Sequence, residues 1–267
     1  MENEYLDNCN CEILSKAIEQ NFSEFFLEMA RLKGCAYGEG NDYNWVKSNG
    51  NYWPSGIFDL KLQGENKKSI VEDMVTKMKS GQLPATVMTG RSLKLQDYDA
   101  IFNRYGLSRK YEAAGMAIDL NKINEFENLM GLTISIAEDR ETLLEWCKIV
   151  GSELFGGSED YVMDFYSTVL KTLDKEKFKC FVGKYNEKVV ATSFLYLNNG
   201  IAGIYFVANH REYRSRGIGR LITLAPLFYA RERNYKIAIL QASPLGEVIY
   251  KKIGFKEYSR LGRYRLD

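Results

Sequence analysis

Histidine and paired cysteine are scarce in this sequence, and each scarcity excludes a class of protein. His210 is the only histidine among 267 residues. A His-rich zinc or iron site is therefore not expected, and a Ser-His or Cys-His nucleophile pair would have to use His210 itself. The cysteines are odd in number and scattered, with no C-x-x-C motif: Cys9, Cys11, Cys35, Cys147 and Cys180. This pattern is typical of reduced thiols, so we expect a cytoplasmic protein without a disulfide framework or a metal.

Long apolar runs and a large charge excess are also missing. No apolar stretch approaches the length of a membrane span, and the N-terminus lacks the basic and apolar regions of a secretory signal. The formal net charge is +1, so neither a membrane nor nucleic acid is an expected partner. Residues 1–128 carry 15 basic and 19 acidic side chains, whereas residues 129–267 carry 21 and 16. An anionic ligand would therefore favour the second half.

Apolar periodicity in the first half predicts alternating helices and strands. A helix is expected over residues 11–33, followed by a loop rich in Gly, Asn and Trp at 38–56. The later elements are expected in this order: a strand at 57–62, a helix at 69–80, a strand at 85–89, a helix at 95–105 and a strand pair at 107–120. The segment 120–132, with three asparagines and Gly131, is expected to link two domains at residues 1–128 and 129–267.

The second half continues the α/β pattern. The elements expected here are a strand at 133–137, helices at 141–153 and 161–173, a hairpin of strands 179–185 and 188–197, and a strand at 201–207. A helix at 218–233, a strand from 235 closed by Pro244, a helix at 245–253 and an aromatic, basic tail complete the chain.

A basic turn with two glycines lies between the strand that ends near Val207 and the helix that begins at Ile218. Gly217 and Gly219 have no Cβ, so phosphate oxygens could approach the backbone closely. The first N–H groups of a helix favour an anion because they lack internal partners. The surrounding charges are Arg211, Arg214, Arg216 and Arg220, opposed by Glu212. The turn therefore predicts a pyrophosphate site, and His210 beside it is expected to be a surface residue.

The spacing Arg214-x-x-Gly217-x-Gly219 resembles the acyl-CoA loop of the GNAT acetyltransferase superfamily. About thirty residues downstream, Tyr-Lys-Lys-Ile-Gly-Phe at 250–255 resembles the superfamily's last motif, whose Tyr lies beside the thioester. The resemblance covers the chain from about Leu132 to its end. It implies an α/β fold of two GNAT-like domains, each a mixed, mostly antiparallel sheet flanked by helices, with acetyl-CoA as co-substrate.

The two halves also resemble each other. Ile-Phe-Asn-Arg-Tyr-Gly-Leu at 101–107 sets out the same pattern as Ile-Tyr-Lys-Lys-Ile-Gly-Phe at 249–255. In the first copy, residues 61–69 replace the arginine and glycine turn, and Phe102 stands where Tyr250 has a hydroxyl. Tandem superfamily members often have a degenerate first copy. We therefore expect a degenerate domain at 1–128 and a catalytic, acetyl-CoA-binding domain at 129–267.

The resemblance assigns roles to single residues. Tyr250 would be the general acid that protonates the departing thiolate. Ser243 would bond CoA or the thiolate, with a plain helix N-cap as the alternative. The residues expected to contact the cofactor are Phe206, Val207, Ala208, Arg214, Ser215, Arg216, Gly217, Ile218, Gly219 and Arg220.

The general base and the acceptor are left open by these patterns. Many relatives have a Glu on the strand that here spans residues 201–207, and no carboxylate is present there. Glu159, Asp160 and Tyr205 are candidates for the acceptor side, with solvated helix-start acids as the alternative for the first two. The C-terminal carboxylate, which serves as the base in some tandem relatives, makes Asp267 a further candidate base.

We expect acetyl transfer to a primary amine of a small molecule by a monomer or homodimer. The alternatives are a CoA-binding sensor without turnover and a protein N-acetyltransferase. The missing strand carboxylate favours the sensor, and an open groove would favour the protein substrate.

Overall fold

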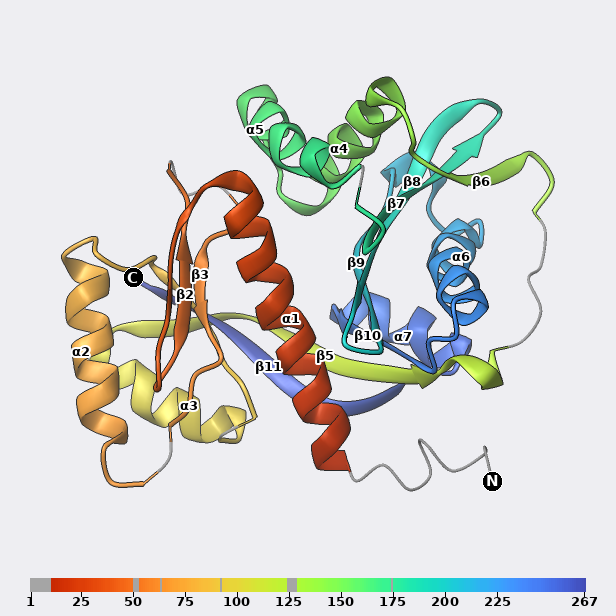
Figure 1. Ribbon diagram of the computed structural model, residues 1–267. Coiled ribbons are helices and arrows are strands. Elements are labelled where there is room, and N and C mark those ends of the chain that lie inside the picture. The colour runs from red at the N-terminus through yellow and green to blue at the C-terminus, as the bar shows by residue number, and fades with distance from the viewer. Residues whose placement is uncertain (1–10, 50–52, 63, 92, 124–128, 174) are drawn as a thin grey trace. The chain divides into compact units, whose positions relative to one another are not determined.

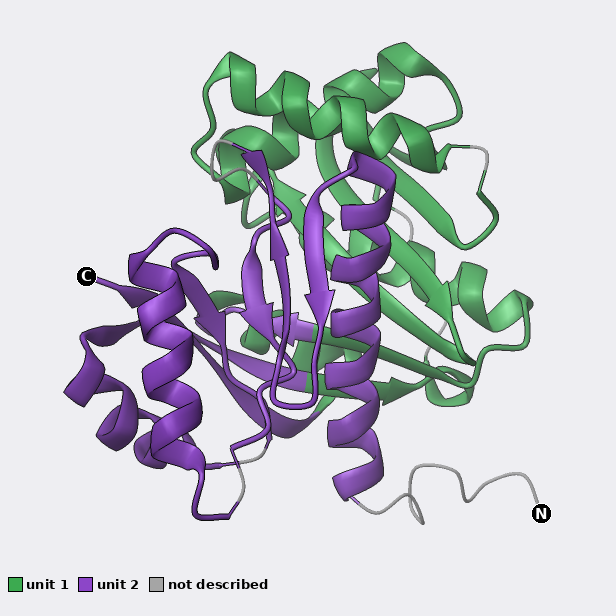
Figure 2. Cartoon of the chain, turned by 60° about the vertical axis from the view of Figure 1, so that its left-hand side comes forward, with its two compact units in different colours: residues 1–8, 116–240, 245–256 green, residues 9–115, 241–244, 257–267 purple. Residues whose placement is uncertain are grey.

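The computed structural model describes residues 11–49, 53–62, 64–91, 93–123, 129–173 and 175–267 (Figure 1). By their contacts the residues form two compact units, each assembled from separate stretches of the sequence (Figure 2). Unit 1 contains residues 116–240 and 245–256, and unit 2 contains residues 9–115, 241–244 and 257–267. Cys9, Gln63 and the predicted boundary at residue 128 lie outside the described residues. The division into domains at 1–128 and 129–267 therefore stays a prediction.

Unit 2 is a sheet with the strand order β1-β2-β3-β4-β11-β5. Its strands are β1 (Ala36–Glu39), β2 (Asn44–Lys47), β3 (Gly56–Phe58), β4 (Thr86–Met88), β5 (Leu107–Asp119) and β11 (Lys256–Leu266). Its helices are α1 (Cys11–Lys33), α2 (Lys67–Lys79) and α3 (Leu95–Phe102), which continues into the 3-10 turn η2 (Asn103–Tyr105). The pairs β1–β2, β2–β3 and β4–β11 are antiparallel, whereas β3 and β4 are parallel.

The predicted helix over residues 11–33 is confirmed as α1. Its buried residues include Leu14, Ile18, Phe25 and Met29, which recur at helical spacing and form one apolar face. The helix ends at Gly34, whose φ of +81° is the left-handed conformation that glycine adopts at helix C-termini.

Two expectations for unit 2 are wrong. The loop predicted at 38–56 contains the β1–β2 hairpin, because Gly38 leaves room for the Trp45 indole directly opposite it. The strand pair predicted at 107–120 is the single strand β5. Gly115 makes no turn there: the Ser259 hydroxyl lies against it where a Cβ would project.

Unit 1 has the strand order β5-β10-β9-β8-β7-β6, with the end of β5 at its edge. Its strands are β6 (Leu132–Ile136), β7 (Phe178–Tyr185), β8 (Lys188–Asn198), β9 (Ile201–Asn209) and β10 (Ile237–Ala242). Its helices are α4 (Arg140–Leu154), α5 (Glu159–Val169), α6 (Ile218–Glu232) and α7 (Pro244–Ile253), with 3-10 turns η3 (Leu120–Lys122), η4 (Leu170–Thr172) and η5 (Arg211–Tyr213). The β6-to-β9 pairs are antiparallel and β9–β10 is parallel, so the predicted mixed sheet is confirmed.

Helices α4 and α6 cover opposite faces of the unit 1 sheet. On β8, the Ser193 hydroxyl donates to the Ile222 carbonyl of α6 at 2.7 Å, while the neighbouring Phe194 ring lies 5.9 Å from Trp146 of α4. Successive side chains of a strand point to opposite faces. These two contacts therefore place the two helices on either side of β8.

Neither cysteine pairing nor a membrane-spanning helix is found in the described part of the chain. Cys11, Cys35, Cys147 and Cys180 are all free thiols there, and burial raises the pKa of the Cys147 and Cys180 thiols. No described helix combines the length and apolarity that crossing a bilayer requires.

Candidate functional site

Strand β9 leaves the sheet ladder at Phe206 and Val207. Its register with β8 pairs Tyr205 with Phe194 and Ala208 with Thr192, so β9 has one residue more than β8 between these pairs. This is a β-bulge, and Phe206 adopts the left-handed φ of +48° within it. A non-glycine residue in this conformation is strained, and such strain gathers at functional sites.

The parallel partner of β9 also ends its pairing early. Strands β9 and β10 pair from Ile201 to Gly203 and from Ile237 to Ile239. Among the described residues of these two strands, neither the β8 nor the β10 register includes Phe206 or Val207. The bulge is held in place on the β8 side, where the Phe206 carbonyl accepts from the Thr192 hydroxyl at 3.0 Å.

The chain then forms the glycine-arginine turn, residues 211–219. Ser215 and Gly217 both have left-handed φ angles, +62° and +80°, which coil the backbone around the start of α6. Gly217 is the helix N-cap and supplies no side-chain bond. Within the described structure, no hydrogen bond engages the N–H of Gly217 or Ile218. These two donors lie at the N-terminus of α6, the positive end of its dipole, which favours an anion.

The arginines of this turn have different partners. Arg214 donates to the Glu153 carboxylate of α4 at 2.7 Å, and a second oxygen of Glu153 accepts from the Arg211 backbone N–H at 3.3 Å. Arg216 stacks on the Tyr213 ring, with 5.1 Å between the guanidinium carbon and the ring centroid. Arg214 and Glu153 therefore hold the turn against α4, a function that the sequence pattern did not assign to Arg214.

Asn209 is a second residue that the sequence analysis missed. Its side-chain oxygen accepts from the Gly219 backbone N–H at 2.9 Å, and its amide nitrogen donates to the Ala208 carbonyl at 3.1 Å. A Cβ on Gly219 would lie 2.9 Å from the Asn209 amide. The close approach explains the glycine at 219, and it leaves Gly217 and Ile218 rather than Gly219 as the open donors.

Tyr250 lies half-buried on α7, with its ring 5.9 Å from the Phe255 ring in an edge-on arrangement. Its carbonyl accepts from the N–H groups of Gly254 and Phe255 at 3.1 and 3.0 Å, so the backbone around it is fixed. Gly254 has a φ of +115°, which requires glycine at the Gly-Phe step. Ser243 directly precedes α7, and its side chain is half-buried.

The candidate acceptor residues belong to different elements. Glu159 and Asp160 are exposed in the first turn of α5, where acids favour the helix dipole without any further role. Tyr205 is buried in β9. Asp267 accepts from Ser108 and Lys110 at 2.7 Å, and these bonds lower the pKa of its carboxyl. A lowered pKa makes this side-chain carboxyl a poor general base.

The sole histidine is partly buried at the start of the turn. The Nδ1 atom of His210 lies 3.8 Å from the Glu212 carboxylate, and its ring packs edge-on against Tyr213 at 5.9 Å. These contacts hold the ring within the turn, where it is less exposed than a surface residue. Among the residues that the structure describes, no cluster of His, Cys, Asp and Glu could hold a metal ion.

Comparison with known proteins identifies a segment that includes the glycine-arginine turn. Residues 120–239 match the family model of the acetyltransferase (GNAT) domain. The search of curated proteins found no match.

The solved structures confirm the predicted fold class. A GCN5-related N-acetyltransferase from Kribbella flavida matches with a TM-score of 0.67 and 11% identity over 91% of this chain and 94% of that chain. A GCN5-related N-acetyltransferase from Sphaerobacter thermophilus matches with a TM-score of 0.61 and 17% identity over 84% of this chain and 76% of that chain. A tandem GNAT protein from the clavulanic acid biosynthesis pathway matches with a TM-score of 0.58 and 12% identity over 83% of this chain and 77% of that chain.

Proposed function

Because residues 120–239 match the model of the acetyltransferase (GNAT) domain, we propose that the chain transfers an acetyl group from acetyl-CoA, bound at the glycine-arginine turn, to a primary amine. The observation that carries this proposal is the start of α6. There Gly217 holds a left-handed φ of +80°, and the N–H groups of Gly217 and Ile218 are open toward an anion. The site follows directly on the bulged end of β9, where Phe206 and Val207 lie outside the registers with β8 and β10, which suits the amide groups of a pantetheine arm.

Three groups of this chain would share the chemistry. The amine nitrogen attacks the thioester carbonyl carbon, the carbon–sulfur bond breaks, and the sulfur leaves as a thiolate. Backbone dipoles of Phe206, Val207 and Ala208 at the end of β9 would polarise the carbonyl, and preset dipoles of this kind are usually the largest catalytic term. Tyr250 would then give its phenolic proton to the thiolate, and Ser243 would bond the sulfur or CoA. The amine must lose a proton to a base, for which water and Glu159 or Asp160 are candidates.

The site in unit 1 accounts for one donor molecule per chain. In the first half, residues 61–69 have no Arg-x-x-Gly-x-Gly spacing, and Phe102 has no hydroxyl to donate. Phe102 is fully buried, with its ring 4.7 Å from that of Tyr264 and 5.4 Å from that of Tyr98. These contacts support a structural role for Phe102. We further propose a small-molecule acceptor, a cytoplasmic location, and a monomer or homodimer.

Thiol release and calorimetry test this function together. The purified chain, mixed with acetyl-CoA and a panel of primary amines, is expected to release CoA thiol and to form an acetylated amine detectable by mass spectrometry. Calorimetry should give one CoA per chain, and Gly217→Glu combined with Gly219→Glu should abolish the binding. CoA binding without thiol release for any amine or peptide would identify a sensor instead. Release with peptides alone would identify a protein acetyltransferase.

A further inference from the structure

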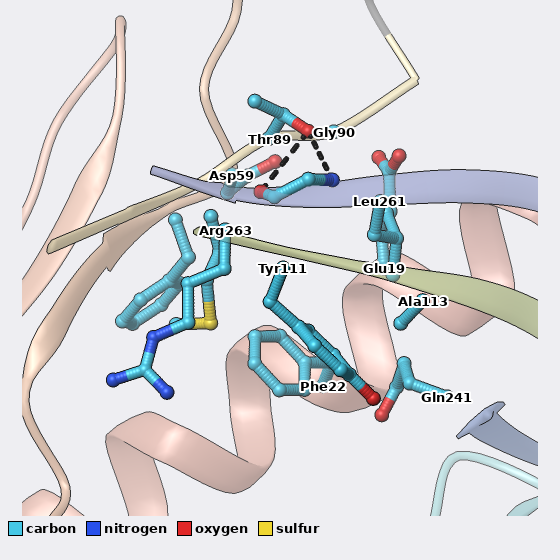
Figure 3. A pocket seen from close by; sticks show the side chains of 13 residues that line it. Glu19, Phe22, Asp59, Thr89, Gly90, Tyr111, Ala113, Gln241, Leu261 and Arg263 are labelled. Atoms are coloured by element: carbon cyan, nitrogen blue, oxygen red, sulfur yellow. Dashed lines mark hydrogen bonds between the residues drawn. The ribbon is translucent and has the colours of Figure 1, made fainter. Parts of the chain in front are cut away.

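Unit 2 contains a cavity of about 200 Å³ that the glycine-arginine turn does not line (Figure 3). We call it the Glu19 cavity. All of its lining residues belong to unit 2, and they come from α1, β3, β4, β5, β10, β11 and the segments that follow β3 and β4. A cavity of about 150 Å³ accommodates benzene. The Glu19 cavity therefore has room for an aromatic ring with a short chain.

The walls of this cavity are mainly apolar. Its apolar lining residues are Phe22, Phe58, Met88, Ala113 and Leu261. The Thr89 hydroxyl accepts from the Gly262 N–H at 2.7 Å and donates to the Gly262 carbonyl at 3.3 Å, as the dashed lines of Figure 3 show. These bonds fix the end of β4 to β11. The part of the cavity wall that β4 and β11 form is therefore fixed, as a preformed ligand site requires.

A carboxyl group is buried in this apolar surrounding. The Glu19 side chain is 15% exposed, and its Oε1 atom is completely buried without a hydrogen-bond partner. The other oxygen, Oε2, lies 3.7 Å from the Arg91 Nε. Gly90 faces the carboxyl group, and a Cβ there would lie 3.2 Å from Oε1. A buried acceptor without a donor is costly, so the structure maintains a group that a ligand would satisfy.

Further polar groups reach the same cavity. The Gln241 side chain at the end of β10 has a buried amide nitrogen without a partner. Figure 3 shows the Tyr111 ring between Phe22 and Gln241, with its hydroxyl directed toward Gln241. Asp59, held in a left-handed φ of +53°, adds a second carboxylate to the lining. The apolar walls of the cavity suit an apolar ligand body, and its two carboxyl groups suit a cationic group on that ligand.

We propose that the Glu19 cavity binds a small organic ammonium ion with a benzene-sized apolar body, whose N–H groups donate to Glu19 and whose ring packs against Phe22 and Phe58. This binding is independent of the proposed function, because it requires neither acetyl-CoA nor turnover.

The charges around Glu19 set the pH dependence of this binding. They are Arg91, whose backbone and side chain lower the pKa of the Glu19 carboxyl, and Asp59, which raises it. Arg263 also lines the cavity, and Lys61 lies 3.4 Å from Asp59. Burial outweighs the other causes and raises the pKa of Glu19 to about 7. Affinity for the ammonium ion should therefore rise between pH 6 and pH 8, as Glu19 ionises.

Calorimetry with two matched probes tests the site. We would titrate the full chain, without acetyl-CoA, with 2-phenylethylamine and with its neutral counterpart 2-phenylethanol at pH 8. The amine is expected to bind with one molecule per chain and at least tenfold more tightly than the alcohol. Equal affinities, or no amine binding at millimolar concentration, would overturn the proposal.

Three variants assign the binding to this cavity. Glu19→Gln removes the charge and should weaken amine binding at least tenfold while leaving 2-phenylethanol unchanged. Glu12→Gln is the control, because Glu12 also pairs with Arg91, at 3.2 Å, from the same helix but does not line the cavity. Ala113→Leu should fill the cavity and weaken both probes, and its thermal unfolding would verify that it folds. Amine affinity that survives both Glu19→Gln and a folded Ala113→Leu would place the amine elsewhere and refute the site.

The outcome also separates this proposal from the proposed function. Glu19-dependent amine binding without CoA thiol release would support the cavity and count against the transferase. Thiol release with primary amines, together with equal affinities for the two probes, would support the transferase and refute the cavity.

Discussion

The Arg214 guanidinium lies 2.7 Å from the Glu153 carboxylate, so the first residue of the Arg-x-x-Gly-x-Gly spacing is held by the last full turn of α4. Glu153 is mostly buried, whereas the Arg214 side chain is 56% exposed. The same carboxylate accepts from the Arg211 backbone N–H. Glu153 therefore shapes the backbone of the turn as well as the position of one arginine.

We expect Glu153→Ala to weaken acetyl-CoA binding about fivefold, because an ion pair with an exposed partner contributes up to about 1 kcal/mol. Arg214→Ala should have a similar effect. The double variant should bind acetyl-CoA no more weakly than the more severe single variant, since both substitutions remove the same contact. Glu145→Ala is the control: on the same helix it pairs with Lys148 at 2.7 Å on the exposed surface. Fully additive effects in CoA calorimetry would argue against this coupling.

Gly217 and Gly200 offer a matched pair of substitutions. Both have left-handed φ angles, +80° and +76°, and a Cβ would meet nothing within 4 Å at either position. Each change to Ala should therefore lower the free energy of unfolding by about 1–2 kcal/mol through backbone strain. Only Gly217→Ala should also raise the KM for acetyl-CoA, because relaxing its φ moves the open N–H groups. An equal rise for Gly200→Ala would contradict the assignment of the donor site.

Local patterns predicted the elements whose signal lies within a few residues. The α1 helix follows from apolar spacing alone, and the β7–β8 hairpin from two alternating strands about Asn186 and Glu187, both of which have left-handed φ angles. The pairing of β11 with β4 joins Arg263 to Met88. Contacts so distant in sequence leave no local pattern. The aromatic tail was therefore expected without its sheet partner.

The candidate site likewise contains residues that local spacing predicts and residues that depend on contacts distant in sequence. The glycines and Tyr250 could be identified because their spacing resembles a family motif. Asn209 and Glu153 could not, since their roles depend on the meeting of β9, α4 and the turn in space. Glu19, in contrast, has a local signal in the sequence, an acid among apolar positions of a helix. It follows Ser15 and Ile18 and precedes Phe22 on the face of α1 that the core covers, where an acid is exceptional.

Tyr250→Phe tests the proposed proton donor. The ring remains, so its contact with Phe255 and the folding of α7 should persist, and CoA affinity should change little. The single-turnover rate should fall about 10²-fold, since proton donation by a positioned group contributes about 10² to 10⁴. Tyr166→Phe is the control. The Tyr166 hydroxyl donates to the Arg140 carbonyl at 3.3 Å and takes no part in the glycine-arginine turn. An unchanged single-turnover rate for Tyr250→Phe would assign the ring to packing alone.

Glu19 should make the stability of the protein fall with rising pH. Burial raises the pKa of the Glu19 carboxyl from 4.5 to about 7, so between these values the folded chain binds a proton that the unfolded chain has released. Stability from this group is therefore complete below about pH 4.5 and is lost as the pH rises through about 7. The loss is of the order of 3 kcal/mol, because each pKa unit corresponds to about 1.4 kcal/mol.

Glu19→Gln cannot ionise, and we expect its unfolding midpoint to exceed that of the wild type at pH 8 and to match it near pH 4.5. Thermal unfolding of both proteins across this range measures the difference. Glu12→Gln, which alters an exposed acid of the same helix, should follow the wild type at every pH. A Glu19→Gln variant that is less stable than the wild type at pH 8 would show that the ionised carboxylate is stabilised by Arg91. The buried acid would then be a structural ion pair and no longer a group that awaits a cationic ligand.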